Sequence, residues 1–353
     1  SFIRLYKTYP IAINPEDAGL CLPQRRRHPR FIPLRPHLRR RRSCLPVPPD
    51  PVRKFQESGV YDNIENVYEN LIKILGKDWS GAPNCFGDTG VITRHKILNT
   101  FEVVRTGMNV RIQLKHSGQE ISIWSMHLQH EKYGPDKAVK GGTLDEILSG
   151  ENEIRQFRGR IHNIVELLRH PAFVEQIKNA ENVPVIVTGD FNVPSHLDWT
   201  ESTKDKNNDW IVDWPVTKLL TTAAGMTDSY REIHPDPVKN PGYTWTVYKQ
   251  YDNQDAKKDR IDFMFYRGSI KATSSYTYSG VSEIIDDGTD MWKTNEWPSD
   301  HWALVTEFNV FETRKTKPAL QPSSDGFYID PEFLKGMSEE VKKCSAKIFH
   351  YRG

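Results

Sequence analysis

The sequence predicts one α/β domain of layered sheets with helices outside, covering residues 55–311. Apolar residues alternate with polar ones in several short segments, as in strands that are buried on one face. In other segments they recur every three or four residues, as in amphipathic helices. Because the two patterns are mixed along the chain, we expect sheets and helices to share one core. A length of 353 residues and an apolar fraction of 37% are enough for such a core.

The net charge of +2 is the average of two unlike parts. Residues 1–54 hold eleven Arg and two Lys against Glu16, Asp17 and Asp50, a net charge of +10, so the remaining residues carry −8. Residues 25–53 are rich in Arg and Pro and show no helix or strand period. Three interpretations stay open for this segment: a basic arm that binds a polyanion, a solvated tail, or a stretch that is not native coding sequence.

Composition excludes several classes of protein. No apolar run approaches the 18 residues that indicate a transmembrane helix, and no secretory signal pattern is visible. The four cysteines show neither paired spacing nor zinc-ligand spacing. We therefore expect a soluble, monomeric protein, and either a cytoplasmic or a secreted location is compatible with this pattern.

The elements can be placed by their patterns. We expect helices over 64–75 and 153–168, a hairpin with strands 110–115 and 120–128, further strands at 90–93, 100–105, 183–187, 259–266 and 303–308, and a polar tail from 312 to 353 with one helix over 331–344. Residues 129–152, 195–213 and 271–296 are expected to be loops, and such loops carry substrate specificity.

The buried strand 183–187 leads into Thr188-Gly189-Asp190-Phe191-Asn192. If the chain stays extended, Asp190 and Asn192 point to the same side. A carboxylate there can hold or activate a water, and an amide can bind an oxyanion. An Asx-turn that ends the strand is an equally good interpretation.

Two further segments carry acidic residues and a histidine. Asp300 and His301 come directly before the strand 303–308, where they suit either a catalytic pair or a surface turn. Asp262 lies within an apolar strand, where a carboxylate is costly unless it is paired, and a histidine is a natural partner. His127 ends a hairpin strand, and Glu57 offers an oxygen ligand that suits Mg²⁺.

The chain order of the motifs FQES, SMHL, GDFN, RIDF and PSDH resembles that of the endonuclease/exonuclease/phosphatase superfamily, the deoxyribonuclease-I-like phosphoesterases. The loops around Trp199 and Trp245 resemble a little-characterised branch of it. The resemblance implies a four-layer α/β sandwich, in which two mixed sheets pack face to face with helices outside. It also implies a hydrolase of phosphoric esters that depends on Mg²⁺, with Mn²⁺ or Ca²⁺ as alternatives. The substrate would be a nucleic acid, a phospholipid head group or a small phosphodiester.

The same resemblance implies roles for individual residues. Glu57 would bind the metal ion and Asp300 would lie close to it. Asp190 and His301 would act on the attacking water, Asp262 would orient His301, Asn192 would hold the water or a phosphoryl oxygen, and His127 would face the leaving group.

Residues 1–54 depart from the pattern of this superfamily, because they show no strand that ends in a metal-supporting Asn, and Pro51 disfavours a central strand before Gln56. We expect these residues to be irregular. A catalytically impaired member that acts as a binding or scaffolding protein is therefore the alternative function.

Overall fold

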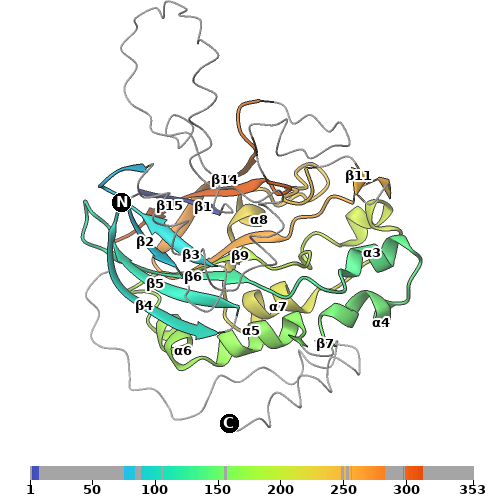
Figure 1. Cartoon of the computed structure of the whole chain (residues 1–353), viewed down its shortest axis with the longest axis horizontal. Helices are drawn as coiled ribbons and strands as arrows, with labels where there is room; N and C mark the ends of the chain where they lie inside the picture. Colours follow the sequence, from blue (N-terminus) through green and yellow to red (C-terminus); the bar gives the residue numbers. More distant parts are fainter. Residues whose placement is uncertain are drawn as a thin grey trace, which may run out of the picture.

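The structure is a computed structural model that describes residues 2–7, 75–83, 89–104, 106–154, 157–247, 250–251, 254–255, 257–282, 297 and 299–312. Two sheets stack on each other, and helices cover the outer face of the larger one (Figure 1). The predicted α/β sandwich is confirmed in these three layers. The helix that we expected over 64–75 lies outside the described residues, except for its last residue, as does the tail from 313 to 353.

The larger sheet has six strands in the order β10-β13-β9-β6-β5-β4. Only β6 and β9 run parallel, and all other neighbours are antiparallel. The strands are β4 (Lys96–Val104), β5 (Gly107–Gln113), β6 (Glu120–His127), β9 (Val185–Asp190), β10 (Thr227–Asp228) and β13 (Asp262–Arg267).

The smaller sheet has the order β1-β15-β14, with β1 (Phe2–Lys7), β14 (Ile270–Tyr278) and β15 (Ala303–Val310), all antiparallel. Three two-stranded pairs complete the strands: β2 (Ser80–Pro83) with β3 (Gly90–Thr93), β7 (Glu153–Ile154) with β8 (Phe157–Arg158), and β11 (Gln250–Tyr251) with β12 (Gln254–Asp255).

The helices among the described residues are short. They are α3 (Gly134–Val139), α4 (Leu144–Ile147), α5 (Arg160–Arg169), α6 (Pro171–Lys178), α7 (Pro215–Thr222) and α8 (Ser229–Ile233), with the 3-10 helices η2 (Leu148–Gly150) and η3 (Glu201–Asn207). Proline stands in the first turn of α3, α6 and α7, where its missing N–H has no helical partner to lose. No helix of the described residues is long and apolar enough to cross a membrane.

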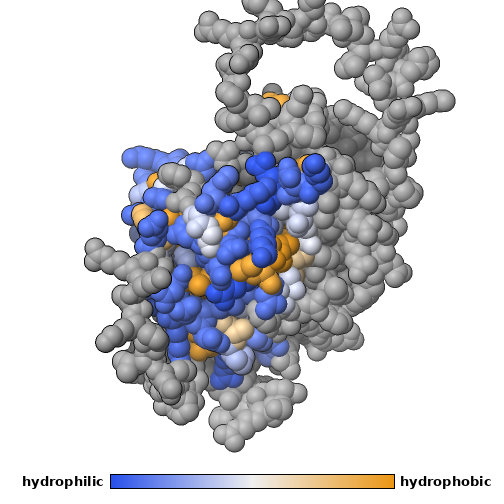
Figure 2. Space-filling model, turned by 90° about the vertical axis from the view of Figure 1, so that its left-hand side faces the viewer, coloured by the Kyte–Doolittle hydropathy of each residue, from blue (hydrophilic) through white to orange (hydrophobic). Residues whose placement is uncertain are grey.

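Side-chain alternation along β9 divides the core in two. Val185 and Val187 pack with α5, α6 and α7, whereas Ile186 between them packs with β14 and β15 on the opposite face. Strand β9 is therefore buried on both faces, which explains the continuous apolar run in its sequence. Burial of one such side chain contributes about 1.5–3 kcal/mol to the free energy of folding. On the side of the molecule shown in Figure 2, hydrophilic residues cover most of the described surface, and hydrophobic residues form small patches between them.

Several predicted boundaries need correction. The helix expected over 153–168 begins only at Arg160, because Gly159 before it is extended, with a ψ of 172°, and Glu153–Ile154 pairs instead with Phe157–Arg158 as β7 and β8. The segment 271–296 was expected to be a loop, but its first part forms most of β14, in which Ile270 and Ala272 alternate with exposed residues. Residues 129–152 contain α3 and α4.

The basic segment was expected to be irregular from its first residue. Phe2–Lys7 instead forms β1, which pairs with residues 304–309 of β15. Residues 8–54 lie outside the described residues, and the domain boundaries 55–311 remain a prediction.

Candidate active site

Three of the predicted site residues lie in one row across the six-stranded sheet. The strand register places His127 of β6 opposite Asp190 of β9, and Asp190 opposite Asp262 of β13. Paired positions point to the same face of a sheet, so these side chains are neighbours. The register thus brings together residues that are more than sixty positions apart in sequence.

Gly189 permits this close pairing. Its φ is +154°, and a Cβ there would lie 1.8 Å from the carbonyl oxygen of Met126 on β6. Any larger residue would push β9 away from β6 and would displace Asp190, which follows directly. The glycine of the GDFN motif is therefore required by backbone contact.

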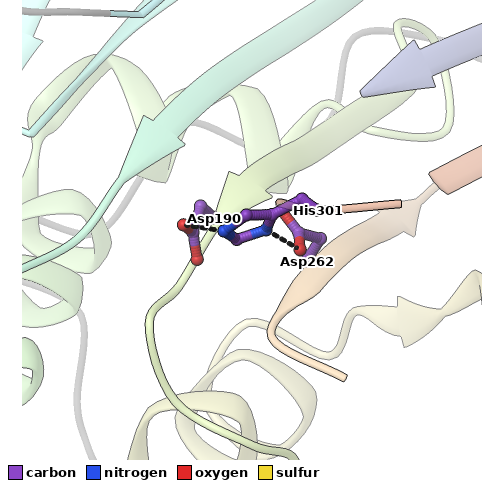
Figure 3. A group of neighbouring side chains, drawn as sticks. All are labelled: Asp190, Asp262 and His301. Carbon is purple, nitrogen blue, oxygen red and sulfur yellow. Dashed lines mark hydrogen bonds and ion pairs between the residues drawn. The ribbon is translucent and has the colours of Figure 1, made fainter. Parts of the chain in front are cut away.

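His301 reaches the row from the second sheet, just before β15. Its Nδ1 is 2.8 Å from Oδ2 of Asp262, and both side chains are buried. Figure 3 shows the imidazole between Asp262 and Asp190. The His301 backbone is held as well: its N–H donates to Oγ of Ser299, and its carbonyl accepts from Nε1 of Trp297. Because an ionised carboxylate only accepts hydrogen bonds, Nδ1 carries the proton and Nε2 is left as an acceptor.

Two imidazoles converge on one oxygen of Asp190. Oδ2 of Asp190 is 3.8 Å from Nε2 of His301 and 3.9 Å from Nε2 of His127. These separations exceed a hydrogen bond. A single water, which can donate two hydrogen bonds, can therefore bond to the carboxylate and to an imidazole at the same time.

The structure corrects the reasoning about Asn192. The chain is not extended there, because Asn192 has a φ of +53°, so side-chain alternation does not apply. Its backbone N–H donates to Oδ1 of Asp190 at 2.8 Å, which is the Asx-turn that the sequence left open. Its Nδ2 donates to the carbonyl of Leu128 at 2.9 Å and ties the GDFN turn to the end of β6. The turn thus orients Asp190 and leaves Oδ2 toward the histidines.

The two predicted metal residues have different outcomes. Glu57 lies outside the described residues. Asp300 accepts a hydrogen bond from Nε1 of Trp245 on its Oδ2 at 3.0 Å. Its Oδ1 is buried and accepts no hydrogen bond from the described part of the chain. A buried carboxylate oxygen of this kind fits a hard divalent cation.

Within the described residues, the donor atoms that lie close enough together to share one ion belong to Asp190, Asp262 and His301. The short bond between Asp262 and Nδ1 of His301 already uses two of the three groups. We therefore interpret this group as an acid–base arrangement.

Sequence reasoning missed a second layer of residues behind the row. Oγ1 of Thr244 accepts from the backbone N–H groups of Ile261 and Asp262, at 3.0 Å each, and so holds the start of β13. Trp245 forms backbone bridges to both Asp259 and His301. No pattern in the sequence marks Thr244 or Trp245 for this position.

Asp259 and Tyr133 form a buried pair beside Trp245. The Tyr133 hydroxyl donates to Oδ2 of Asp259 at 2.9 Å, and Nε1 of Trp199 donates to Oδ1 at 3.2 Å. Burial raises the pKa of Asp259 above its ordinary value, and burial together with Asp259 raises that of Tyr133 well above its own. The argument that marked Asp262, a carboxylate beside an apolar strand, would also have found Asp259.

The loop that follows His127 is fixed by a buried ion pair. Arg160 of α5 donates through Nε to Glu151 at 2.8 Å, and both side chains are fully buried. The other nitrogens of its guanidinium bind the backbone carbonyls of Gln129, Glu131 and Lys132. This pair anchors the chain between β6 and Tyr133.

Comparison with known proteins adds a family relationship. The model of the Endonuclease/Exonuclease/phosphatase family matches residues 153–301. An uncharacterized protein from Caenorhabditis elegans is 36% identical over 253 residues, which cover 69% of this chain and 78% of that protein.

Several solved structures also match this chain, at low sequence identity. The catalytic domain of human Nocturnin with bound sulfate is 17% identical with a TM-score of 0.40, over 69% of this chain and 76% of that one. TDP2 of D. rerio, complexed with a single-strand DNA product, is 16% identical with a TM-score of 0.37, over 66% and 76%. A mannosyl-6-phosphatase of Bacteroides thetaiotaomicron is 16% identical with a TM-score of 0.37, over 70% and 82%.

Proposed function

Because the chain belongs to the endonuclease/exonuclease/phosphatase family, we propose that it is a metal-dependent hydrolase of phosphoric esters that reacts at Asp190 and His301. One observation carries the proposal: the carboxylate of Asp190 and Nε2 of His301 face each other at 3.8 Å, with Asp262 behind the imidazole. Both facing atoms are hydrogen-bond acceptors. A water between them would donate one proton to each and keep a lone pair for attack on phosphorus.

Each residue of the row then has a part in the reaction. Asp262 holds His301 in the tautomer that accepts a proton at Nε2 and stabilises the charge that forms there. Asp190, oriented by the Asn192 turn, holds the water. An amide nitrogen has two N–H donors, and Asn192 uses one on Leu128, which leaves the other for a phosphoryl oxygen. His127 lies across Asp190 from His301, on the side we assign to the leaving group.

The metal ion would be held by Asp300 together with Glu57, through carboxylate oxygens that suit Mg²⁺. When bound, the ion supplies Lewis-acid polarisation of the phosphoryl oxygens. We propose Mg²⁺, with Mn²⁺ and Ca²⁺ as alternatives, and a phosphate ester of nucleic acid, phospholipid head group or small-diester type as substrate.

Hydrolysis of bis-p-nitrophenyl phosphate, with Mg²⁺ and with excess chelator, tests the proposal. We expect turnover that requires the metal ion and is lost in Asp190→Ala. Asp213→Ala is the matched control, because Asp213 is an exposed carboxylate whose partner is Lys218 on the surface of α7. Absence of metal-dependent turnover in the folded wild-type chain would refute the proposal and support the alternative, a catalytically impaired binding protein.

A further inference from the structure

A basic pocket lies beside the active site, between η3 and residues 257–260. We use this name for a cavity of about 40 Å³ whose lining includes Lys206, Lys257, Lys258, Tyr243, Asp198 and Asp259. A water needs roughly 10–15 Å³ of such space, so the pocket has room for about three waters. That is enough for one small anionic group such as a phosphate.

The acidic side chains of the basic pocket are already bound by other groups. Asp198 accepts from Nε of Arg231 at 2.6 Å and from Nε of Arg260 at 2.9 Å. Asp259 accepts from Tyr133 and Trp199, and its burial favours the neutral form. The three lysines therefore give the lining an excess of positive charge, which favours an anion.

Lys257 is held in place before any ligand binds. Its ammonium donates to the carbonyl of Lys206 at 2.8 Å and to Oδ1 of Asn207 at 3.1 Å. It also lies over the Trp199 ring, 4.9 Å from the ring centre. An ammonium has three donors, so one stays for an anion in the pocket. A fixed side chain loses little conformational entropy on binding, which favours affinity.

The basic pocket adjoins the reacting groups through two backbone bridges. Asp259, which lines the pocket, pairs with Trp245, and Trp245 pairs with His301. Each antiparallel pair separates Cα atoms by about 4.5–5.5 Å, so Asp259 and His301 are about 10 Å apart. The charge of Asp190 also helps to raise the pKa of Tyr133, which is hydrogen-bonded to Asp259.

We propose that the basic pocket binds a second phosphate group of the substrate, so that the preferred substrates are phosphoric esters that carry another phosphate close to the scissile one. This inference rests on the proposed function, because it assigns the scissile phosphate to Asp190 and His301. Lys257 and Lys206 are the specificity-determining residues.

Two esters that differ only in the second phosphate test the inference: thymidine 5′-(p-nitrophenyl phosphate) with and without a 3′-phosphate. For the wild type, we expect the second phosphate to lower KM by about tenfold, the effect of one hydrogen bond to a charged group. Lys257→Gln and Lys206→Gln should bring the ratio of the two KM values toward one. Lys204→Gln should keep the ratio, because Lys204 lies on η3 but pairs with Glu201 outside the pocket.

The outcomes separate the two proposals. No hydrolysis of either ester would overturn the proposed function. If the wild-type enzyme hydrolyses both esters with equal KM values, the proposed role of the basic pocket is wrong and the proposed function stands. Loss of the ratio in Lys204→Gln to the same extent as in Lys257→Gln would also overturn it, because surface charge would then explain the effect. If the Lys257→Gln variant does not fold, the Lys206→Gln variant still tests the inference, because Lys206 is exposed and its replacement leaves the core unchanged.

Discussion

Replacement of Asp262 by Asn keeps the size of the side chain but removes the negative charge 2.8 Å from Nδ1 of His301. A hydrogen bond to a charged group contributes about 1.5–3 kcal/mol. Since 1.36 kcal/mol is a factor of ten in rate, its loss in the transition state lowers kcat by about 10- to 150-fold. If the new amide turns its NH₂ toward His301, the imidazole takes the wrong tautomer. The corresponding change in a Ser-His-Asp triad lowers kcat by about 10⁴-fold. We therefore expect a loss between these limits.

The assay is the initial rate on bis-p-nitrophenyl phosphate with saturating Mg²⁺, normalised to the folded fraction from urea denaturation. Asp228→Asn is the matched control. Asp228 is a buried carboxylate whose partner is Arg260, 2.8 Å away, so its replacement removes a buried charge that does not contact the site. We expect this control to lose stability and to keep its kcat.

A kcat for Asp262→Asn within about threefold of the wild type would refute the reasoning, because it would limit the contribution of the charge to less than about 1 kcal/mol. Equal losses of kcat in the two variants would refute it as well, since they would show a general effect of buried charge.

Three further predictions follow from the second layer and from buried groups. Trp245→Phe removes the hydrogen-bond donor to Asp300, so we expect a higher Mg²⁺ concentration for the half-maximal rate. The unfolding free energy from urea denaturation should fall by about 1 kcal/mol. An unchanged Mg²⁺ requirement would contradict the proposed position of the ion near Asp300. Arg160→Met leaves Glu151 buried without its partner and should cost about 3–5 kcal/mol of unfolding free energy, whereas a loss below about 1 kcal/mol would show that the loop is anchored otherwise. Burial lowers the pKa of His196 in the folded protein. The contribution of this residue to stability is therefore present above the ordinary pKa of 6.5 and is lost as the pH falls through the lower pKa of the folded state. His196→Gln should make the unfolding free energy, measured by urea denaturation from pH 7 to 4.5, depend less on pH.

Individual strands could be predicted from the sequence where one local pattern of residues dominates. The strands β5, β6 and β9 were predicted from their own residues alone, and the structure confirms them, although β5 and β6 are buried on both faces. Gly159 shows the limit of such reasoning. The helical spacing of apolar residues continues across it, but Gly159 is extended and the residues on its N-terminal side include the paired strands β7 and β8.

The sequence by itself determined which residues could take part in the chemistry: Asp190 and His127 at strand ends, Asp262 in an apolar strand, and His301 before another. Only the tertiary structure decided how they meet. The row from His127 to Asp262 depends on hydrogen-bond register between strands that are distant in sequence, and such register is a property of paired strands. His301 completes the row because β15 belongs to the second sheet, packed on the first.

The same reason explains why the positions of Tyr133 and Trp245 were missed. Their contacts are made between loops, whose positions follow from the packing of the two sheets, and no periodic pattern encodes them. The sequence names the candidate reacting groups because their chemistry is local to each residue. Their distances, tautomers and neighbouring charges are set by contacts between distant segments, so the fold alone decides them.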